Sequence, residues 1–566
     1  MAAASVGTGF CSLLLAYGPY DRQIFYDYLH QPLLVLVNIL PAVLLAFLLW
    51  FASGKAWIAQ LVSSLAILGL SIADFYKMYF RSDPLMFRDI FIAGTGLKAG
   101  LGYDFKLSGR PIFCVIFIII TVLFLAFFCR LKPSKSIRII FTVAIIAVCF
   151  PLKTTYTGNA VYNGIQNFEH LNKWVATDVY VSKGFVYPFI HSIPEAFPKA
   201  PEGYSEKYVK ELFEELGESD IPEDKKVDII AIQLEAFTDL TRTGVSGIED
   251  FVYEDYHKLI DECFSGRLVT GIFAGDTIAT ERSFATGFTY NNVYRKDVGS
   301  YMWYLKDQGY VTEGAHPFDQ GMYNRININR YLGFDNYWYA QNRYTAITGT
   351  DRANDDVFMS DLLELYRQRD KSKPYFSMSV SYQGHGPYST DKLKWGDGYY
   401  TGTYSDPESY YILNNYLGSI HNTIKNILKL KAGLEIEADP VVLVLFGDHM
   451  PWLGDGRSVY NDLGINLDTS TDDGFFNYYS TEYLIWANKA AKSALGCEIR
   501  GKGPDISSCY LMNVLFDVLG WDYGSPFMKL TGLLMQEQPI IVNHKNTELY
   551  QKHEIAQYYL KYKYKK

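Results

Sequence analysis

Long apolar runs in the first 155 residues place the strongest limit on what this chain can fold into. Four of them are long enough, or nearly so, to cross a bilayer as helices: Leu33–Phe51, Trp57–Ala73, Pro111–Cys129 and Ile137–Leu152. A fifth run, Ala3–Gly18, is shorter. It lacks a basic flank and further runs follow it, so we interpret it as a first span rather than a signal peptide. Residues 1–155 are therefore predicted to form an all-α transmembrane anchor of about five spans.

Positive charge in one short loop sets the predicted orientation of this anchor. The loop before the last run carries Arg130, Lys132, Lys135 and Arg138 and no acidic residue. Short loops rich in Lys and Arg stay in the cytoplasm, so the chain after Leu152 is expected outside it. The runs themselves hold almost no charged residue, which favours an anchor over a transporter.

The rest of the chain is predicted to contain a junction, an α/β domain and a tail. Residues 156–226 are rich in aromatic side chains, which suit the membrane–water interface, although an ordinary packed linker is the alternative. From 227 to 545, short β-branched or apolar runs alternate with helical stretches, which predicts a mostly parallel sheet covered by helices on both faces. Residues 546–566 are interpreted as a charged C-terminal tail.

Polar residues follow five of the six strands expected in the α/β domain. These strands are Val227–Leu234, Leu268–Phe273, Tyr310–Gly314, Tyr375–Ser381, Val441–Phe446 and Glu482–Trp486. The residues after the first five include Glu235, Thr277, His316, His385 and the pair Asp448 and His449. Ligands bind beyond the carboxyl ends of the strands in open α/β sheets. We therefore expect these side chains to share one site.

Glu235, Asp448 and His449 offer the carboxylate and imidazole ligands that a divalent cation prefers. Thr277 is the candidate nucleophile, because metal coordination lowers the pKa of a hydroxyl group. It precedes an expected helix, whose N-terminus favours a phosphate. An N-cap role alone is the alternative for Thr277, and Thr280 is the rival nucleophile.

Three further side chains are candidates for contact with a phosphate. His316 and His385 can donate protons or hydrogen bonds to phosphoryl oxygens or to a leaving alkoxide. Arg325 can clamp a phosphate through its planar guanidinium group. The formal net charge of −9 argues against a nucleic-acid partner. Only three of the seven cysteines lie in the soluble part, which does not indicate a disulfide framework.

Four segments together resemble the lipoteichoic acid synthase family, in the sulfatase-like branch of the alkaline phosphatase superfamily. They are Ile229–Phe237, Gly275–Glu281, His385–Tyr388 and Phe446–His449. The resemblance covers nearly the whole chain. It implies that Glu235, Thr277, Asp448 and His449 hold one ion, manganese or magnesium in its place, and that Thr277 becomes covalently phosphoglycerylated.

The resemblance also implies the substrates and the location. Phosphatidylglycerol donates glycerol phosphate, diacylglycerol leaves, and a growing polyglycerolphosphate chain or a glycolipid accepts the group outside the cell membrane. His316, Tyr323, Arg325 and His385 match substrate-contacting positions. Two positions depart from the family: it often has Trp where Tyr323 stands, and some members carry an acid at Phe318.

Several alternatives share this fold. One is a phosphoglycerol or phosphoethanolamine transferase acting on another glycan or glycolipid, although phosphoethanolamine transferases tend to carry several disulfides. Another is a sulfatase-like hydrolase, but a true sulfatase needs a Cys or Ser followed by a Pro-x-Arg motif, and the segment around Thr277 has no Cys and no following Pro. A non-catalytic receptor would have lost the four metal positions, which are all intact.

Overall fold

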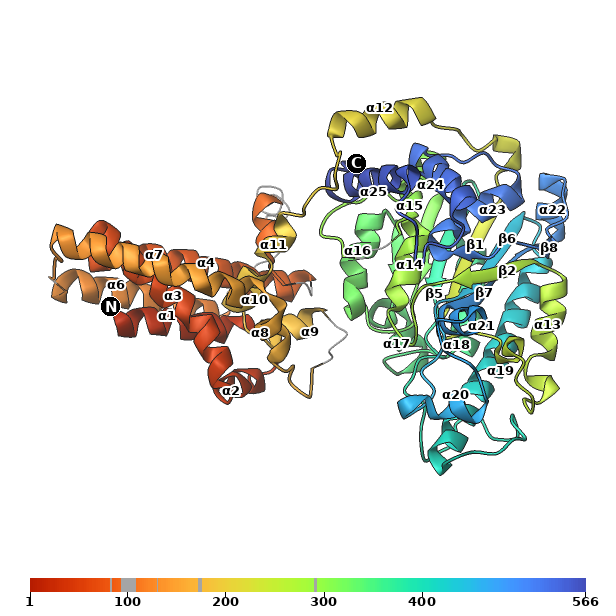
Figure 1. Cartoon of the computed structure of the whole chain (residues 1–566), viewed down its shortest axis with the longest axis horizontal. Helices are drawn as coiled ribbons and strands as arrows, with labels where there is room; N and C mark the ends of the chain where they lie inside the picture. Colours follow the sequence, from red (N-terminus) through yellow and green to blue (C-terminus); the bar gives the residue numbers. More distant parts are fainter. Residues whose placement is uncertain (82–83, 93–107, 130, 172–175, 290–292) are drawn as a thin grey trace. The chain divides into compact units, whose positions relative to one another are not determined.

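The computed structural model describes residues 1–566 except 82–83, 93–107, 130, 172–175 and 290–292, and it divides into two compact units (Figure 1). The N-terminal unit contains Met1–Lys199 together with Gly321–Asn327. The C-terminal unit contains Ala200–Gln320 and Ile328–Lys566. The first division between them falls inside the predicted junction 156–226. Arg130, one of the four basic residues that set the predicted orientation, lies outside the described residues.

The N-terminal unit is a bundle of apolar helices. Within the described residues, four helices are long and apolar enough to cross a membrane: α3 (Pro32–Ser53), α4 (Ala56–Arg81), α6 (Gly109–Phe128) and α7 (Lys135–Thr157). The helix α1 (Ala2–Ala16) is shorter, but polar contacts hold it in the bundle. Gln60 Nε2 on α4 donates to Thr8 Oγ1 at 3.1 Å, and the hydroxyls of Ser12 and Ser71 are 2.8 Å apart. Such interhelical hydrogen bonds stabilise helix pairs in membranes. The predicted all-α membrane bundle is thus confirmed.

Short helices that follow α7 pack their aromatic side chains inside this unit. They are α8 (Asn159–Gly164), α9 (Ala176–Val181), α10 (Val186–His191) and α11 (Ile193–Ala196), and they are joined by α2 (Gln23–Leu29) and η1 (Phe87–Ile92). Tyr187 is buried and donates to Thr155 O, while Tyr28 donates to Val181 O at 2.7 Å. The described residues of these short helices therefore pack within the N-terminal unit, and their predicted place at the membrane–water interface stays a prediction.

A mostly parallel sheet forms the centre of the C-terminal unit, as predicted. Within the described residues it has nine strands in the order β4-β3-β5-β1-β6-β7-β2-β8, with β9 beside β2. Their bounds are β1 Asp228–Leu234, β2 Phe264–Val269, β3 Val311–Ala315, β4 Asn336–Trp338, β5 Tyr375–Val380, β6 Val441–Gly447, β7 Ser480–Ala487, β8 Gly501–Lys502 and β9 Ile506–Ser507. Among these nine described strands, β7 runs antiparallel to its neighbours β6 and β2, and the other pairs are parallel.

Helices cover both faces of this sheet (Figure 1). In β1, Ile229 and Ala231 join one buried cluster and Ile230 and Ile232 join the other, so the strand is apolar on both faces. The first cluster includes residues of α14 (Thr277–Thr286), α15 (Tyr301–Asp307), α23 (Leu511–Leu519), α24 (Pro526–Glu537) and α25 (Glu548–Tyr562). The second includes α13 (Glu254–Asp261), α18 (Asp355–Gln368) and α19 (Pro407–Glu435). The remaining α-helices are α12 (Glu206–Leu216), α16 (Arg325–Leu332), α17 (Thr345–Thr348), α20 (Ser458–Asp462), α21 (Asp472–Tyr479) and α22 (Lys489–Leu495).

The strand predicted at Leu268–Phe273 ends earlier, at Val269. The antiparallel β7 lies between β2 and β6, so the chain must cross the end of β7 to reach the centre of the sheet. Along this crossing Thr270 N donates to Tyr479 O at 2.8 Å, and Ala274 N donates to Met450 O at 3.0 Å. Thr277 is therefore carried by a crossing segment rather than by the strand end itself.

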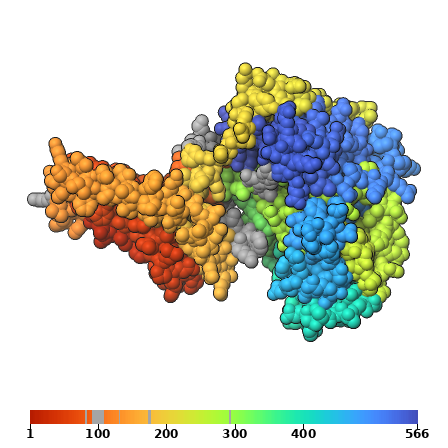
Figure 2. Space-filling model, viewed as in Figure 1, coloured from red at the N-terminus to blue at the C-terminus, as the bar shows by residue number. Residues whose placement is uncertain are grey.

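The residues predicted as a charged tail fold into α25, so that part of the prediction is wrong. Tyr550, His553, Ala556 and Leu560 are buried along one side of the helix, at the three- and four-residue spacing of an amphipathic helix. The lysines and glutamates that suggested a tail occupy the other positions. Figure 2 shows this C-terminal segment (dark blue) packed into the surface beside α12 (yellow).

Candidate active site

Glu235, Thr277, Asp448 and His449 lie together in the C-terminal unit. One ligand atom from each of Glu235, Asp448 and His449 lies within 4.8 Å of the others. Thr277 Oγ1 is 3.2 Å from Glu235 Oε2 and 3.4 Å from His449 Nε2. All four side chains are buried. The four residues that the sequence assigns to a metal thus form one buried cluster.

Neighbouring strands and two glycines bring the acidic residues together. Glu235 and Asp448 follow β1 and β6, which are adjacent and parallel. A Cβ atom at Gly447 would lie 2.1 Å from Phe237 O, so only glycine allows the two strand ends to approach. On the other side of β1, Ser381 Oγ accepts a hydrogen bond from Glu235 N at 2.9 Å. A Cβ at Gly384 would lie 2.0 Å from Glu235 O.

Hydrogen bonds orient the donor atoms for a cation. His449 Nδ1 is 2.9 Å from Met450 O, and because a carbonyl only accepts, Nδ1 carries the proton and Nε2 keeps its lone pair toward the cluster. Asp448 Oδ1 accepts from Ala236 N at 2.7 Å and His449 N at 2.8 Å. Among the described residues, the buried Asp448 Oδ2 has no hydrogen-bond partner.

This arrangement fits one divalent cation. A buried carboxylate oxygen without a partner is costly unless a cation or a donor faces it. Here it lies 3.2 Å from the imidazole Nε2 of His449, close to the second carboxylate of Glu235. Two carboxylates, one imidazole and one hydroxyl suit a hard or borderline ion rather than a thiophilic one.

Thr277 is the first residue of α14, and Asp276 occupies the N-cap position in a left-handed conformation with φ 60°. The N-cap alternative for Thr277 is therefore not what the structure has. Gln233 Nε2 donates to Thr277 O at 3.0 Å, which fixes the start of the helix on β1. The free N–H groups of a first helical turn attract an anion such as a phosphate.

Thr280, the rival nucleophile, lies one turn further along α14. Its hydroxyl donates to Asp448 O at 2.9 Å, and the residue is fully buried. The hydroxyl of Thr277 instead donates to Glu235 Oε2, a proposed metal ligand. The structure thus gives Thr280 a supporting contact and places the Thr277 oxygen inside the cluster.

His316 and His385 contact one shared tyrosine. His316 follows β3, is buried, and its Nδ1 lies 3.0 Å from Val380 O. His385, half-buried, stacks on Tyr382 with ring centroids 5.2 Å apart and planes 13° apart. The His316 ring meets the same tyrosine at 6.1 Å, nearly edge-on. The sequence analysis did not single out Tyr382.

Phe318 extends this contact into an aromatic wall. Its ring stacks on Tyr382 at 4.2 Å and 17°, and the guanidinium of Arg352 lies 5.3 Å and 5.5 Å from the two ring centroids. Arg352 is also paired with Asp351 through two hydrogen bonds of 2.9 Å. Phe318 and Tyr382 thus form an aromatic surface with the Arg352 guanidinium over both rings.

Tyr323 and Arg325 belong to the segment Gly321–Asn327 of the N-terminal unit. Tyr323 lies in η5 (Met322–Asn324) and Arg325 begins α16. Arg325 is buried and its guanidinium lies 5.4 Å from the Tyr323 ring. Their roles as substrate-binding residues stay predictions.

A family model described as Sulfatase matches residues 237–521, half of the chain. The chain belongs to the sulfatase family. This confirms the predicted sulfatase-like branch and its α/β fold. The matched range of the sulfatase domain includes Thr277, His316, His385 and the Asp448–His449 pair, and Glu235 lies two residues before it.

This sulfatase-family chain is similar to one curated protein, the putative cyclic beta-1,2-glucan modification protein of Rhizobium meliloti (strain 1021). The two are 24% identical over 332 residues, which is 56% of this chain and 50% of the relative. The chain thus spans about half the length of that relative.

Solved structures with a similar fold include three transferases. Streptococcus pyogenes phosphoglycerol transferase GacH, in complex with sn-glycerol-1-phosphate, is 17% identical with a TM-score of 0.48, covering 64% of this chain and 95% of its own. Lipoteichoic acid synthase LtaP from Listeria monocytogenes is 19% identical with a TM-score of 0.40, covering 56% and 79%. Lipooligosaccharide phosphoethanolamine transferase A from Neisseria meningitidis is 12% identical with a TM-score of 0.37, covering 92% and 95%.

Proposed function

We propose that this chain is a membrane-bound phosphotransferase that moves glycerol phosphate from phosphatidylglycerol to a growing polyglycerolphosphate chain of the lipoteichoic acid type. A covalent phosphothreonine at Thr277 links the two halves of the reaction. The observation that carries the proposal is the position of the Thr277 hydroxyl, 3.2 Å from Glu235 and 3.4 Å from His449, at the start of a helix. A nucleophile, a candidate metal site and an anion-binding helix end thus coincide.

One ion, Mn²⁺ or Mg²⁺, would be held by Glu235, Thr277, Asp448 and His449. When bound, it supplies Lewis acidity and lowers the pKa of a coordinated hydroxyl group. The protein contributes the orientation of the ligands. Met450 O fixes the His449 tautomer, and two backbone N–H groups hold Asp448 Oδ1 so that Oδ2 faces the cluster.

In the first half-reaction, the Thr277 hydroxyl gives up its proton to solvent, and its Oγ1 attacks the phosphorus atom of phosphatidylglycerol. The bond between phosphorus and the diacylglycerol oxygen breaks, and that oxygen takes a proton from His316 or His385. The free N–H groups at the start of α14 stabilise the negative charge on the phosphoryl oxygens. The product is a phosphodiester that joins glycerol to Thr277.

In the second half-reaction, the acceptor hydroxyl attacks the same phosphorus atom and gives its proton to the histidine. The Thr277 oxygen leaves and takes up a proton from solvent, and the enzyme returns to its starting state. Tyr323, Arg325 and His385 are proposed to hold the glycerol phosphate. The planar fork of Arg325 suits two phosphoryl oxygens.

The test uses the full chain with Mn²⁺ and phosphatidylglycerol labelled in the glycerol head group. The wild-type protein is expected to release diacylglycerol and to retain label on Thr277. Thr277→Ala should lose both, whereas Thr390→Ala, at an exposed threonine, should retain both. Diacylglycerol release that persists in Thr277→Ala contradicts the covalent mechanism, and release that depends on Thr280 instead moves the nucleophile by one helical turn.

Parallel assays separate the alternatives. Transfer from phosphatidylethanolamine in place of phosphatidylglycerol would identify a phosphoethanolamine transferase. Cleavage of an aryl sulfate without any lipid donor would identify a sulfatase-like hydrolase. Because the curated relative is named for a cyclic β-1,2-glucan, one assay offers such a glucan as acceptor. Label in the glucan but not in polyglycerolphosphate would change the acceptor and leave the role of Thr277 intact.

A further inference from the structure

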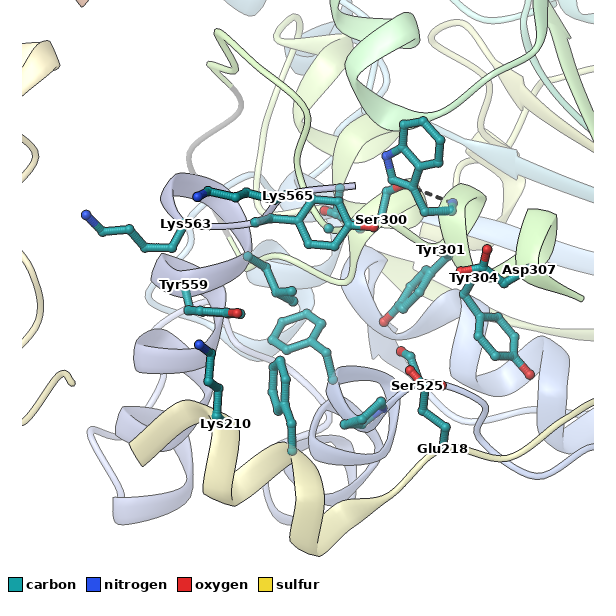
Figure 3. A pocket seen from close by; sticks show the side chains of 18 of the residues that line it. Lys210, Glu218, Ser300, Tyr301, Tyr304, Asp307, Ser525, Tyr559, Lys563 and Lys565 are labelled. Carbon is teal, nitrogen blue, oxygen red and sulfur yellow. Dashed lines mark hydrogen bonds between the residues drawn. The ribbon is translucent and has the colours of Figure 1, made fainter. Parts of the chain in front are cut away.

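A cavity of about 1030 Å³ lies in the C-terminal unit, apart from the Thr277 cluster (Figure 3). Its walls come from α12, α15, the start of α24 and the C-terminal end of α25. Thr286, at the last position of α14, also lines it, whereas Thr277 is the first residue of that helix. At a rise of 1.5 Å per residue the two threonines are about 13 Å apart along the helix axis. None of the four residues of the Thr277 cluster lines this cavity.

Aromatic side chains form much of the wall. In Figure 3 the Tyr559 ring points into the cavity from α25 and Tyr301 lies across from it on α15; Tyr304 of α15 also lines the cavity. Tyr559 is half-buried and meets the edge of Phe213 at 6.0 Å, so the cavity has a flat apolar surface. The hydroxyl of Tyr304 donates to Ser219 O at 2.8 Å, which holds that ring in place.

The charged side chains that line the cavity have a net formal charge of zero. Four lysines and four carboxylates line the cavity. Lys210 is paired with Glu206 at 2.7 Å, and Asp307 is paired with Lys566. Lys563 and Lys565 make no ion pair within 4 Å among the described residues, and in Figure 3 they lie on the α25 side of the cavity, away from Glu218.

We propose that this cavity binds a neutral saccharide. The C–H faces of a sugar ring pack against flat aromatic rings. Sugar hydroxyls both donate and accept hydrogen bonds, which matches a mixture of carboxylate acceptors and ammonium donors. A phospholipid head group or an anionic polymer would need an excess of positive charge, and here the carboxylates would repel it.

This inference does not depend on the proposed reaction. Binding requires neither Thr277 nor a metal ion, because the cavity shares no residue with that cluster. It adds a place where a glycan is held while the sulfatase-family domain acts, about 13 Å along α14 from the candidate nucleophile.

The test is isothermal titration calorimetry of the full chain in phosphatidylcholine nanodiscs. The probes are the neutral hexasaccharides cellohexaose, laminarihexaose and maltohexaose, and a sulfated hexasaccharide is the anionic comparison. At least one neutral probe is expected to bind, with or without EDTA. Loss of one stacked ring in Tyr559→Ala should weaken binding about fivefold, and Tyr559→Phe should bind as the wild type does.

Tyr558→Ala is the matched control, since Tyr558 lies beside Tyr559 on α25 and does not line the cavity. Its affinity should equal that of the wild type, as should that of Thr277→Ala. The proposal is overturned if no neutral probe binds, if Tyr559→Ala binds as well as Tyr558→Ala, or if the sulfated probe binds more tightly than all three neutral ones.

Discussion

Asp448 is the residue of the candidate site whose hydrogen bonding points most directly to a bound cation. One carboxylate oxygen is held by two backbone N–H groups, and the other is buried without a hydrogen-bond partner among the described residues. In the absence of a cation this unpartnered oxygen destabilises the folded protein. With a cation, the same oxygen becomes a ligand. The Asp448 carboxylate therefore destabilises the folded protein without a cation and stabilises it when a cation is bound.

Asp448→Asn should reveal that change of sign. The amide keeps an oxygen for the two N–H groups and removes the buried charge, so the variant should be more stable than the wild type in EDTA. With saturating Mn²⁺ the wild type should be the more stable protein, because binding to the folded state adds RT ln(1 + [L]/Kd). Thermal unfolding in both conditions checks this. Equal Mn²⁺ stabilisation of the two proteins would remove Asp448 from the metal site.

Residues of the site differ in how far a single sequence can predict them. Glu235, Thr277 and the Asp448–His449 pair follow runs that are recognisable as strands, and parallel strands deliver such residues to one edge of a sheet. Gln233 could have been recognised as a residue that supports the site, because it is a polar residue inside an otherwise apolar strand and it donates to Thr277 O. No sequence pattern indicates Tyr382 or Arg352, because their stacking depends on how two loops fold against each other.

Helix α25 and the segment after β2 are two elements that the sequence alone did not predict correctly, because their structure depends on neighbours distant in the sequence. Periodicity located five of the six expected strands, whereas the strand expected at Leu268–Phe273 shares only Leu268 and Val269 with β2. The end of β2 depends on the antiparallel β7 that separates it from β6. The sequence of residues 268–277 does not indicate that β7 will pack beside β2. In α25, lysines and glutamates between the apolar residues concealed the buried face that Tyr550, His553, Ala556 and Leu560 form at three- and four-residue spacing.

A buried histidine makes the packing of α25 sensitive to pH. His553 is fully buried, and its Nε2 lies 3.1 Å from Thr531 Oγ1 on α24. Burial lowers its pKa from 6.5 to about 3. Between these two values the unfolded chain binds one proton more than the folded chain. The stabilising contribution is therefore complete above pH 6.5 and is lost as the pH falls, by about 1.4 kcal/mol per pH unit.

His553→Leu should remove this dependence of the free energy of unfolding on pH. The free energy of unfolding of the wild type should fall more steeply between pH 6.5 and 4.5 than that of the variant, as measured by urea unfolding with pulse proteolysis. His544→Leu is the control, because His544 is exposed and stacks on Tyr550 at 3.9 Å. If the wild type and His553→Leu lose stability in parallel, the neutral buried histidine is not the cause.

At the scale of the whole molecule, the anchor determines where the chemistry takes place. The sulfatase-family domain follows a bundle whose four long helices are all apolar, within the described residues. Lys132 lies in the short loop before α7 and Lys135 begins that helix, and this basic end is proposed to face the cytoplasm. With that proposed orientation, residues 227–545 would lie outside the cell membrane, on the side where the proposed transfer would take place.

A native cysteine makes this orientation measurable. Cys497 is exposed on the C-terminal unit, whereas Cys263 and Cys509 are buried. A membrane-impermeant maleimide added to intact cells should therefore label the protein, and Cys497→Ser should lose most of that label. A cysteine placed in the basic loop, Ser134→Cys in the Cys497→Ser background, should react only after the membrane is permeabilised. Labelling of the loop in intact cells, with Cys497 reacting only after permeabilisation, would reverse the orientation and place the candidate active site in the cytoplasm.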